Sequence, residues 1–292
     1  MWVHHCSALT QHTIECSILT PTLPISAPNL RTRTLTLLLA VPGVDRIYLY
    51  DHNSTERMSS QVQDYIDSGY VVYHHFTGHH KRFVSGFSST LERFRQTAQG
   101  YAYGRCVRSH SKQHTFMGFI DLDEFLVVRN LSLTGVNQFL QRYEDYGGVS
   151  VHWRVVGSSG VRERPSAPVV QSYTQCMPMA FHLHKQFKTF VNTGFGPVMQ
   201  NPHRPFFSVD RPNAFLVDER FQRIKKGLTN RNTQEWMAVY HYVTKSWEDF
   251  SAKLKRGGGA GVTRVQSFFD NINRRANVTC LDAITSSQKY CK

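Results

Sequence analysis

The sequence predicts a single α/β domain, and three observations carry this prediction. Between residues 44 and 76, two apolar segments of strand length flank a helix-like segment, with short turns between them. The order strand, helix, strand with short connections is typical of α/β proteins. The chain has 292 residues, of which 40% are hydrophobic and 12% aromatic, enough for one substantial core. No internal repeat divides it.

The expected elements follow from the spacing of apolar residues and from the residues that stop each segment. Leu35, Leu38 and Leu39 share one face of a helix expected over 31–41, which Pro42 and Gly43 end. The further helices are expected over 57–67, 88–108, 136–146 and 247–256, and the strands over 44–50, 70–76, 149–156, about 180–191 and 236–243.

These elements place the domain at residues 31–257. Residues 1–30 are rich in Thr and Pro and are expected to be irregular, and residues 258–292 are expected to form a polar C-terminal tail. The six cysteines lack Cys-x-x-Cys spacing, which argues against a zinc ribbon. Cys280 and Cys291 are near enough in sequence to close a small loop. No apolar run reaches the length of a transmembrane helix.

The chain carries a formal charge of +13. Such a surface attracts anionic partners, which include nucleic acid, an acidic membrane face and charged sugars. The basic residues are scattered along the chain, which argues against a simple nucleic-acid-binding tail, and we expect no nucleic-acid partner. A solvated basic face explains the charge as well as a specific anion site does.

The central stretch of the sequence is residues 118–128, where three carboxylates interrupt an apolar run. We expect a buried strand that opens at Asp121, Asp123 and Glu124. Because alternate residues of a strand share a face, Asp121 and Asp123 should point the same way, about 6–7 Å apart. Unpaired carboxylates are costly to desolvate, so a positive group should lie beside them. A Mg²⁺ or Mn²⁺ ion chelated by a diphosphate fits, and acids that face water are the alternative.

Other polar residues stand where the same ligand could be held. Asp51 follows the strand expected over 44–50, and ligands of α/β sheets bind beyond such carboxyl ends, so Asp51 is a candidate contact to a ribose or base. The alternative is an Asx turn in its own loop. His241 is a candidate third metal ligand, and Lys188 and Lys245 are candidate phosphate contacts. The alternative for His241 is a structural histidine, and the alternative for Lys188 is ordinary surface.

Trp153 and Arg154 precede a polar loop at 157–160 that contains Ser159. Sugars stack on aromatic faces, so these three residues are candidate contacts to a sugar acceptor. A tryptophan in the core is equally common and stays the alternative.

Five motifs occur in order along the chain: YDHNST at 50–55, FIDLDEF at 119–125, WRVVGSSG at 153–160, KT at 188–189, and HYVTKS at 241–246 followed by Phe250, Lys253 and Arg256. Together they resemble glycosyltransferase family 92 and its relatives among family-2-like glycosyltransferases, over roughly residues 31–257. Each motif is weak or moderate by itself, whereas five in this order are specific.

The resemblance implies a GT-A fold, a single Rossmann-like α/β domain with a mixed sheet. It implies an inverting transfer of a sugar, commonly galactose, from a UDP-sugar donor to a glycan hydroxyl, with Mn²⁺ or Mg²⁺ as cofactor. By matching position, Asp51 is expected near the nucleotide and Asp121 near the ribose or metal. Asp123 is expected as a metal ligand and His241 as its C-terminal partner, with Glu124 supporting the metal or capping the strand.

Inversion needs a carboxylate that takes the acceptor proton, and three candidates stay open: Glu163, Asp210 and Asp249. The family implies a Golgi or other secretory-pathway membrane, reached through an N-terminal anchor that is not visible in the sequence. Three N-x-S/T sequons agree with that route. Two other classes stay open: a catalytically inactive relative that binds a glycan or nucleotide, and a basic nucleic-acid-binding protein.

Overall fold

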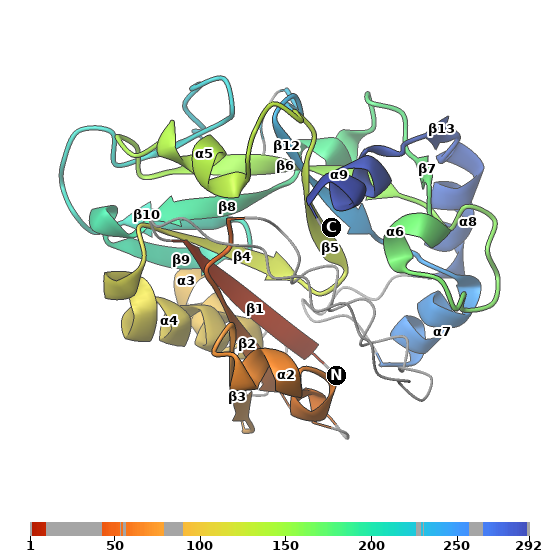
Figure 1. Ribbon diagram of the computed structural model, residues 1–292, viewed down its shortest axis with the longest axis horizontal. Coiled ribbons are helices and arrows are strands. Elements are labelled where there is room, and N and C mark those ends of the chain that lie inside the picture. Colours follow the sequence, from red (N-terminus) through yellow and green to blue (C-terminus); the bar gives the residue numbers. More distant parts are fainter. Residues whose placement is uncertain are drawn as a thin grey trace.

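The computed structural model describes residues 2–9, 43–52, 54, 57–78, 90–225, 229, 231–256 and 265–290. Within these residues the chain forms one curled sheet of eleven strands with helices around it, and a separate two-stranded ribbon (Figure 1). The predicted α/β class is confirmed. The helix expected over 31–41 lies outside the described residues.

The main path of the sheet runs in the order β13-β7-β6-β8-β4-β1-β2-β3, and β5, β11 and β12 pair off this path. The strands are β1 (Trp2–Leu9), β2 (Arg46–His52), β3 (Val71–Phe76), β4 (Phe116–Asp121), β5 (Glu124–Val128), β6 (Gly148–Val156), β7 (Gln175–Cys176), β8 (Phe187–Asn192), β11 (Leu216–Val217), β12 (Met237–Tyr242) and β13 (Val278–Thr279), and the ribbon pairs β9 (Pro197–Asn201) with β10 (Arg204–Phe207).

The helices are α2 (Gln63–Asp67), α3 (Thr90–Arg95), α4 (Ala98–His110), α5 (Val136–Gln141), α6 (Val169–Ser172), α7 (Trp247–Arg256), α8 (Gln266–Arg275) and α9 (Asp282–Tyr290), with short 3-10 turns over Met58–Gln61, Ser111–Gln113, His182–Lys185 and Thr193–Phe195. In the sheet β2 pairs with β3 in parallel, and β6 pairs in parallel with β11 and β12. The neighbours of β1 and β8 are antiparallel, so the sheet is mixed.

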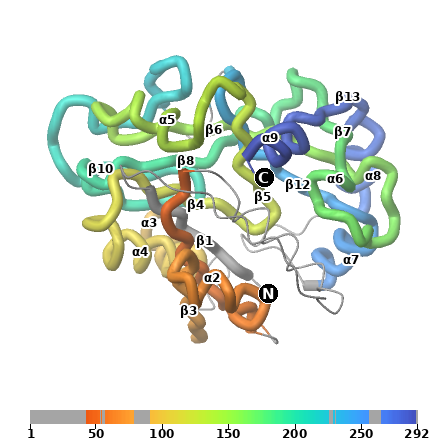
Figure 2. Tube along the Cα trace, in the orientation of Figure 1, coloured from red at the N-terminus to blue at the C-terminus, as the bar shows by residue number. Residues whose placement is uncertain are grey.

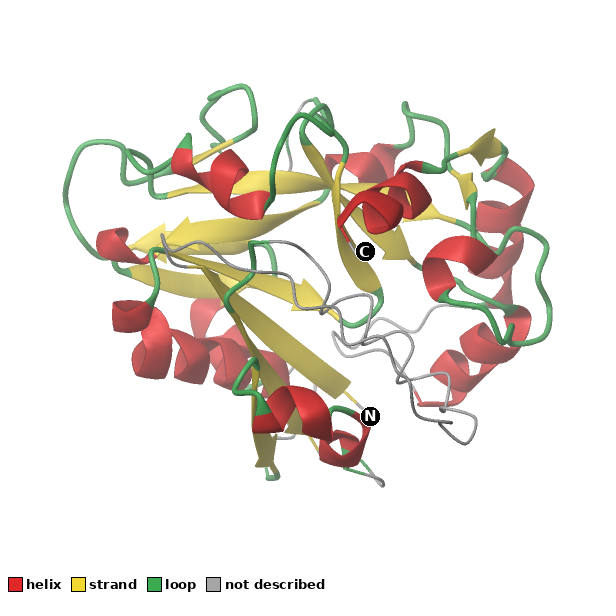
Figure 3. Cartoon of the chain, in the orientation of Figure 1, coloured by secondary structure: helices red, strands yellow, loops and turns green. Residues whose placement is uncertain are grey.

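Strand β2 shows why helices cover both faces of the sheet. Successive side chains of a strand point to opposite faces. Ile47 and Leu49 belong to a core cluster that includes the apolar residues of α5, whereas Tyr48 and Tyr50 belong to a second cluster with α3 and α4. Accordingly α3 and α4 lie on one side of the sheet and α5 on the other (Figure 3). A strand that is apolar on both faces needs this double cover.

Most predicted elements are confirmed, including α7 over the predicted residues 247–256. The segment expected as one helix over 88–108 forms two, α3 and α4. The break occurs at Thr97, whose hydroxyl accepts a hydrogen bond from the Gly100 amide at 3.0 Å and so caps α4. Gly100 fits because a Cβ atom there would lie 1.9 Å from the Phe94 carbonyl oxygen. A capping Thr inside an apolar period marks a helix start that periodicity alone misses.

Both ends of the chain contain more structure than their composition indicates. Within the segment expected to be irregular, β1 pairs antiparallel with both β2 and β4. The segment expected to be a polar tail forms α8, β13 and α9, and it buries Ile272 completely. Figure 2 shows this segment beside α6 and β7. Cys280 is joined to Cys176 by a disulfide, so it does not close the small loop with Cys291 that their spacing allows. No helix of the described residues is long and apolar enough to cross a membrane.

A buried histidine makes the stability of the fold depend on pH. Burial lowers the pKa of His152 to about 4, compared with about 6.5 in an unfolded chain. Below about pH 6.5 the unfolded chain therefore binds a proton that the folded protein does not bind until about pH 4. The stability is complete above that window and is lost as the pH falls through it.

We expect the unfolding free energy to fall by about 1–2 kcal/mol from pH 7 to pH 5, because His152 takes up a proton only when the chain unfolds. Denaturant unfolding at the two pH values measures the loss. The variant His152→Gln should reduce the difference between the two pH values by that amount, whereas His182→Gln, at an exposed position, should leave it unchanged. An undiminished pH dependence in His152→Gln would contradict the assignment.

Candidate active site

Residues 121–124, which carry the three carboxylates, form a tight turn at the edge of the sheet where several strands end. We call this turn and the side chains that contact it the corner. Strand β4 ends at Asp121, residues 122 and 123 form a turn, and β5 begins at Glu124. The predicted buried strand that opens at the acids is confirmed. The pairing pattern makes β2, β4, β6 and β12 point the same way, so their carboxyl ends meet at this edge. That edge is where α/β proteins bind ligands.

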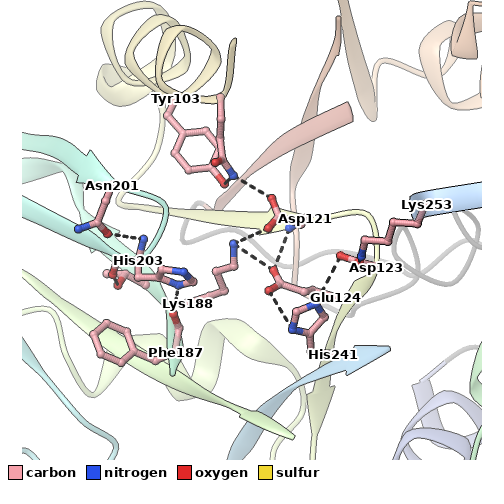
Figure 4. Close-up of polar contacts among 12 residues, drawn as sticks. Tyr103, Asp121, Asp123, Glu124, Phe187, Lys188, Asn201, His203, His241 and Lys253 are labelled. Carbon is pink, nitrogen blue, oxygen red and sulfur yellow. Dashed lines mark hydrogen bonds and ion pairs between the residues drawn. The ribbon is translucent and has the colours of Figure 1, made fainter. Parts of the chain in front are cut away.

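The first feature of the corner is an ammonium group shared by two carboxylates (Figure 4). Lys188 of β8 is fully buried, and its Nζ lies 2.9 Å from Asp121 Oδ2 and 3.1 Å from Glu124 Oε2. Burial alone would lower the pKa of Lys188, but the two carboxylates raise it well above its usual value. Lys188 is therefore a buried cation, and the alternative of an ordinary surface lysine is wrong.

Glu124 connects the two strands of the corner. Its Oε2 also accepts a hydrogen bond from the Asp121 amide at 3.0 Å, which joins the end of β4 to the start of β5. Burial, together with the charges of Asp121 and Asp123, raises the pKa of Glu124 to about 8 against the opposing effect of Lys188. The Lys188 ammonium group is thus shared by Asp121 and Glu124. The Oε1 atom accepts no hydrogen bond among the described residues and lies 3.9 Å from His241 Nδ1.

Asp123 belongs to a second ion pair. Its Oδ2 lies 2.6 Å from Lys253 Nζ of α7, and its Oδ1 lies 3.7 Å from His241 Nε2 of β12. Burial tends to raise the pKa of Asp123, but Lys253 and His241 outweigh burial and hold the pKa well below its usual value. Asp121 and Asp123 thus bind different lysines instead of sharing one partner. The positive groups expected beside them are Lys188 and Lys253.

Gln99 and Tyr103 of α4 extend the corner on the side of Asp121. Gln99 Nε2 donates to Asp121 Oδ1 at 3.1 Å and to the Tyr103 hydroxyl at 3.2 Å. Sequence reasoning missed both residues, and the spacing of four along one helix face is the one signal that could have grouped them. Lys253 stood in a family motif, but nothing in the sequence assigned it to Asp123.

Aromatic rings border the corner on the side of His241. The Trp153 ring lies edge to face with the His241 ring at 4.3 Å and with the His203 ring at 5.5 Å, measured between centroids. The His203 Nδ1–H donates to the Phe187 carbonyl at 2.7 Å, and burial lowers the pKa of His203 to about 4. Trp153 and His203 therefore form a neutral wall next to the charged groups.

The other two predicted acceptor contacts are engaged elsewhere. Arg154 points to the opposite face of β6 from Trp153 and contacts Met179 Sδ at 2.6 Å. The Ser159 hydroxyl oxygen accepts hydrogen bonds from the amides of Thr174 at 2.8 Å and Gln175 at 3.0 Å. Of the three candidates, the structure brings only Trp153 to the corner.

Two predicted contacts to the sugar donor, Asp51 and Lys245, lie near the same edge. Strand β1 lies between the parallel strands β2 and β4, and its residues Val3 and His4 pair with Asp51 and Asp121. Asp51 therefore lies level with Asp121. The Asp51 carboxylate accepts hydrogen bonds from the Ser54 hydroxyl and the Met58 amide of the segment that follows it, and from the Tyr73 hydroxyl of β3.

Lys245 adds positive charge beside Asp123. Its backbone has a φ of +55°, a conformation that residues other than Gly rarely adopt. Burial lowers the pKa of Lys245, while the charges of Asp123 and Asp249 act in the opposite sense. Strained, partly desolvated cations of this kind are found at sites that bind anions.

The three candidate bases differ in their surroundings. Glu163 and Asp210 are exposed to solvent. Asp249 Oδ1 accepts a hydrogen bond from Arg164 Nε at 2.7 Å, and its Oδ2 accepts one from the Ser246 hydroxyl at 3.1 Å. Ser246 in turn accepts from the Asp249 amide, which forms the cap of α7. The assignment of the base stays a prediction.

The residues present fit a divalent cation as a pair of ligands. Among the described residues, no group of three or more His, Cys, Asp or Glu side chains has a metal-binding arrangement. Asp123 Oδ1 and His241 Nε2, 3.7 Å apart, can both bond one ion at about 2.1 Å. Mg²⁺-type ions commonly take one or two protein ligands and complete their shell with phosphate oxygens and water. Asp121, held by Lys188 and Gln99, stays a predicted ligand.

The structure thus has a mixed α/β sheet with paired acidic and basic side chains at the carboxyl ends of its strands. A sequence model described as glycosyltransferase family 92 matches residues 37–276. Family 92 glycosyltransferase proteins of Arabidopsis thaliana and Ricinus communis are 23% and 25% identical to the chain over 228 residues. Each match covers 73% of this chain and 33% of the relative, so the chain spans about a third of the length of these relatives.

The chain belongs to glycosyltransferase family 92. The resemblance stated from the five motifs is confirmed, and so is the GT-A fold that it implies.

Lys188 can be tested as the anchor of the corner. In Lys188→Met the buried Glu124 and the partly exposed Asp121 lose their shared cation, and breaking a buried ion pair typically costs about 3–5 kcal/mol of unfolding free energy. Denaturant unfolding measures it, with Lys185→Met at an exposed position as the control. Adding Glu124→Gln to Lys188→Met should recover part of the loss, because a neutral amide then replaces the fully buried carboxyl group. Equal stability of the two lysine variants would show that the corner does not need the buried cation.

Proposed function

We propose that this chain transfers a sugar, with galactose as the first candidate, from a UDP-sugar to a hydroxyl group of a glycan, with inversion and with Mn²⁺ or Mg²⁺. Membership of the family supports the glycosyl transfer, and the observation that carries the finer proposal is the pairing of Asp123 with His241 beside two lysines. A nucleotide diphosphate with its cation needs this combination of acidic and basic groups.

The roles of the chain's own residues follow from their contacts. Asp123 and His241 would hold the cation, which, when bound, neutralises the departing diphosphate. Lys188 keeps Asp121 in place from inside the protein, and Gln99 holds its other oxygen. Lys245 and Lys253 add positive charge on the side where phosphates would lie. Asp51 would lie near the nucleotide at the level of Asp121.

The acceptor side of the site is proposed at Trp153. Its side chain is buried in the main core cluster and its ring borders His241, so a sugar held against the wall of Trp153 and His203 would lie next to the donor site. The inverting step needs a base on that side, for which Asp249 is the first of the three candidates because its charge acts on Lys245 together with that of Asp123.

We also propose that the protein works in the secretory pathway, such as the Golgi. The disulfide between Cys176 and Cys280 supports this, because such bonds persist in oxidising compartments.

The donor site is tested by calorimetry of UDP binding with and without Mn²⁺. We expect binding that needs Mn²⁺ and weakens at least about tenfold in Asp123→Ala, which corresponds to about 1.4 kcal/mol for a lost ligand. The control is Asp270→Ala, an exposed carboxylate on α8 that should bind as the wild type does.

Two results would contradict the proposal in different ways. UDP binding that ignores both Mn²⁺ and Asp123 would overturn the metal site and leave a nucleotide-binding protein. A folded wild type that binds no UDP under any condition would indicate a non-catalytic relative of the family. Binding as expected would be followed by a screen of UDP-sugars and glycan acceptors.

A further inference from the structure

The two lysines of the corner differ in how firmly they are held. Lys188 has a fully buried side chain and two carboxylate partners. Lys253 has a side chain that is 25% exposed, and its one described ion-pair partner is Asp123, whose side chain is 24% exposed. A lysine ammonium sits on a flexible four-carbon stem with a freely rotating charge. Lys253 can therefore leave Asp123 without opening the core, whereas Lys188 cannot leave Asp121.

Asp123 Oδ2 is the oxygen that Lys253 occupies, and Oδ1 of the same carboxylate faces His241. A divalent cation bound between Asp123 and His241 would bring two positive charges to within a few ångströms of the Lys253 ammonium. Like charges at such a distance repel, and the repulsion is relieved if the lysine turns away. Lys245 already adds positive charge on this side.

We propose that Lys253 is an exchangeable cation: it neutralises Asp123 while the donor site is empty, and it moves to the diphosphate of the donor when a divalent ion binds Asp123. The inference rests on the proposed function. The diphosphate brings the negative charge that the displaced ammonium requires, and α7 places the lysine beside Asp123. Lys253 is thus a positioning residue for the donor and a competitor of the metal.

The test is a comparison of Lys253→Gln with Lys255→Gln, an exposed lysine two residues further along α7. Calorimetry with MnCl₂ alone, and with UDP at saturating Mn²⁺, gives the two affinities. We expect Lys253→Gln to bind Mn²⁺ about threefold more tightly, because the competitor is gone, and UDP with Mn²⁺ about tenfold more weakly, because a phosphate contact is gone. Lys255→Gln should leave both affinities within about twofold of the wild type.

A second measurement follows the lysine itself. The Nζ resonance of Lys253, assigned by its absence from Lys253→Gln, should shift when UDP and Mg²⁺ are added, while that of Lys255 stays in place. Without metal, Lys253→Gln should also lower the thermal midpoint, and saturating Mn²⁺ should remove the difference from the wild type.

The failures can be told apart. If Mn²⁺ and UDP bind the wild type as proposed, but Lys253→Gln leaves Mn²⁺ affinity unchanged or shifts both affinities in one direction, the exchange is overturned and the proposed function stands. An Nζ resonance of Lys253 that ignores UDP and Mg²⁺ overturns it equally. A wild type that binds neither Mn²⁺ nor UDP overturns the proposed function, and the exchange with it.

Discussion

The arrangement of the site depends on one buried ammonium group. Lys188 enters from β8, Asp121 ends β4 and Glu124 begins β5, so a single charge joins three strands at one point. Buried charges are tolerated only when they are paired, so each of these residues constrains the position of the other two. The turn of residues 122 and 123 lies between these two carboxylates. It places Asp123 against Lys253 of α7 and His241 of β12.

The corner therefore contains a permanent part and a part that can change. The permanent part lies inside the sheet, where removal of one partner leaves an uncompensated charge. The part that can change is the pair of Asp123 with Lys253, whose side chains are each about one quarter exposed, so that water reaches the pair and the flexible lysine can leave it. A ligand that brings its own charge can replace such a partner. The neutral imidazole of His203 and the ring of Trp153 keep the neighbouring wall free of competing charge.

The sequence predicted the elements and missed the long-range partners, and the reason is physical. Periodicity and turn residues are local, so the strand that opens at the acids and the helix α7 could be read directly. The cost of burying two carboxylates indicated that a positive group lies near them. It could not name that group, because Lys188 is 67 residues from Asp121 and Lys253 is 130 residues from Asp123. A lysine within the buried strand β8 resembles a surface residue until its partner is known. The disulfide between Cys176 and Cys280 could not be predicted for the same reason, because the two cysteines are 104 residues apart.

The balance of charge also separates the classes of function that the sequence left open. A protein that binds nucleic acid needs cations free to meet phosphates along a surface. At this corner the Lys188 side chain is buried and paired with carboxylates, so it is not available to phosphates along a surface. An inactive relative could keep the buried lysine, because the fold needs it. Such a relative would not need Asp123 and His241 to bind a cation. In the proposed function, Asp123 and His241 would hold the cation of a ligand that also carries phosphates, and a UDP-sugar with its metal is a ligand of that kind.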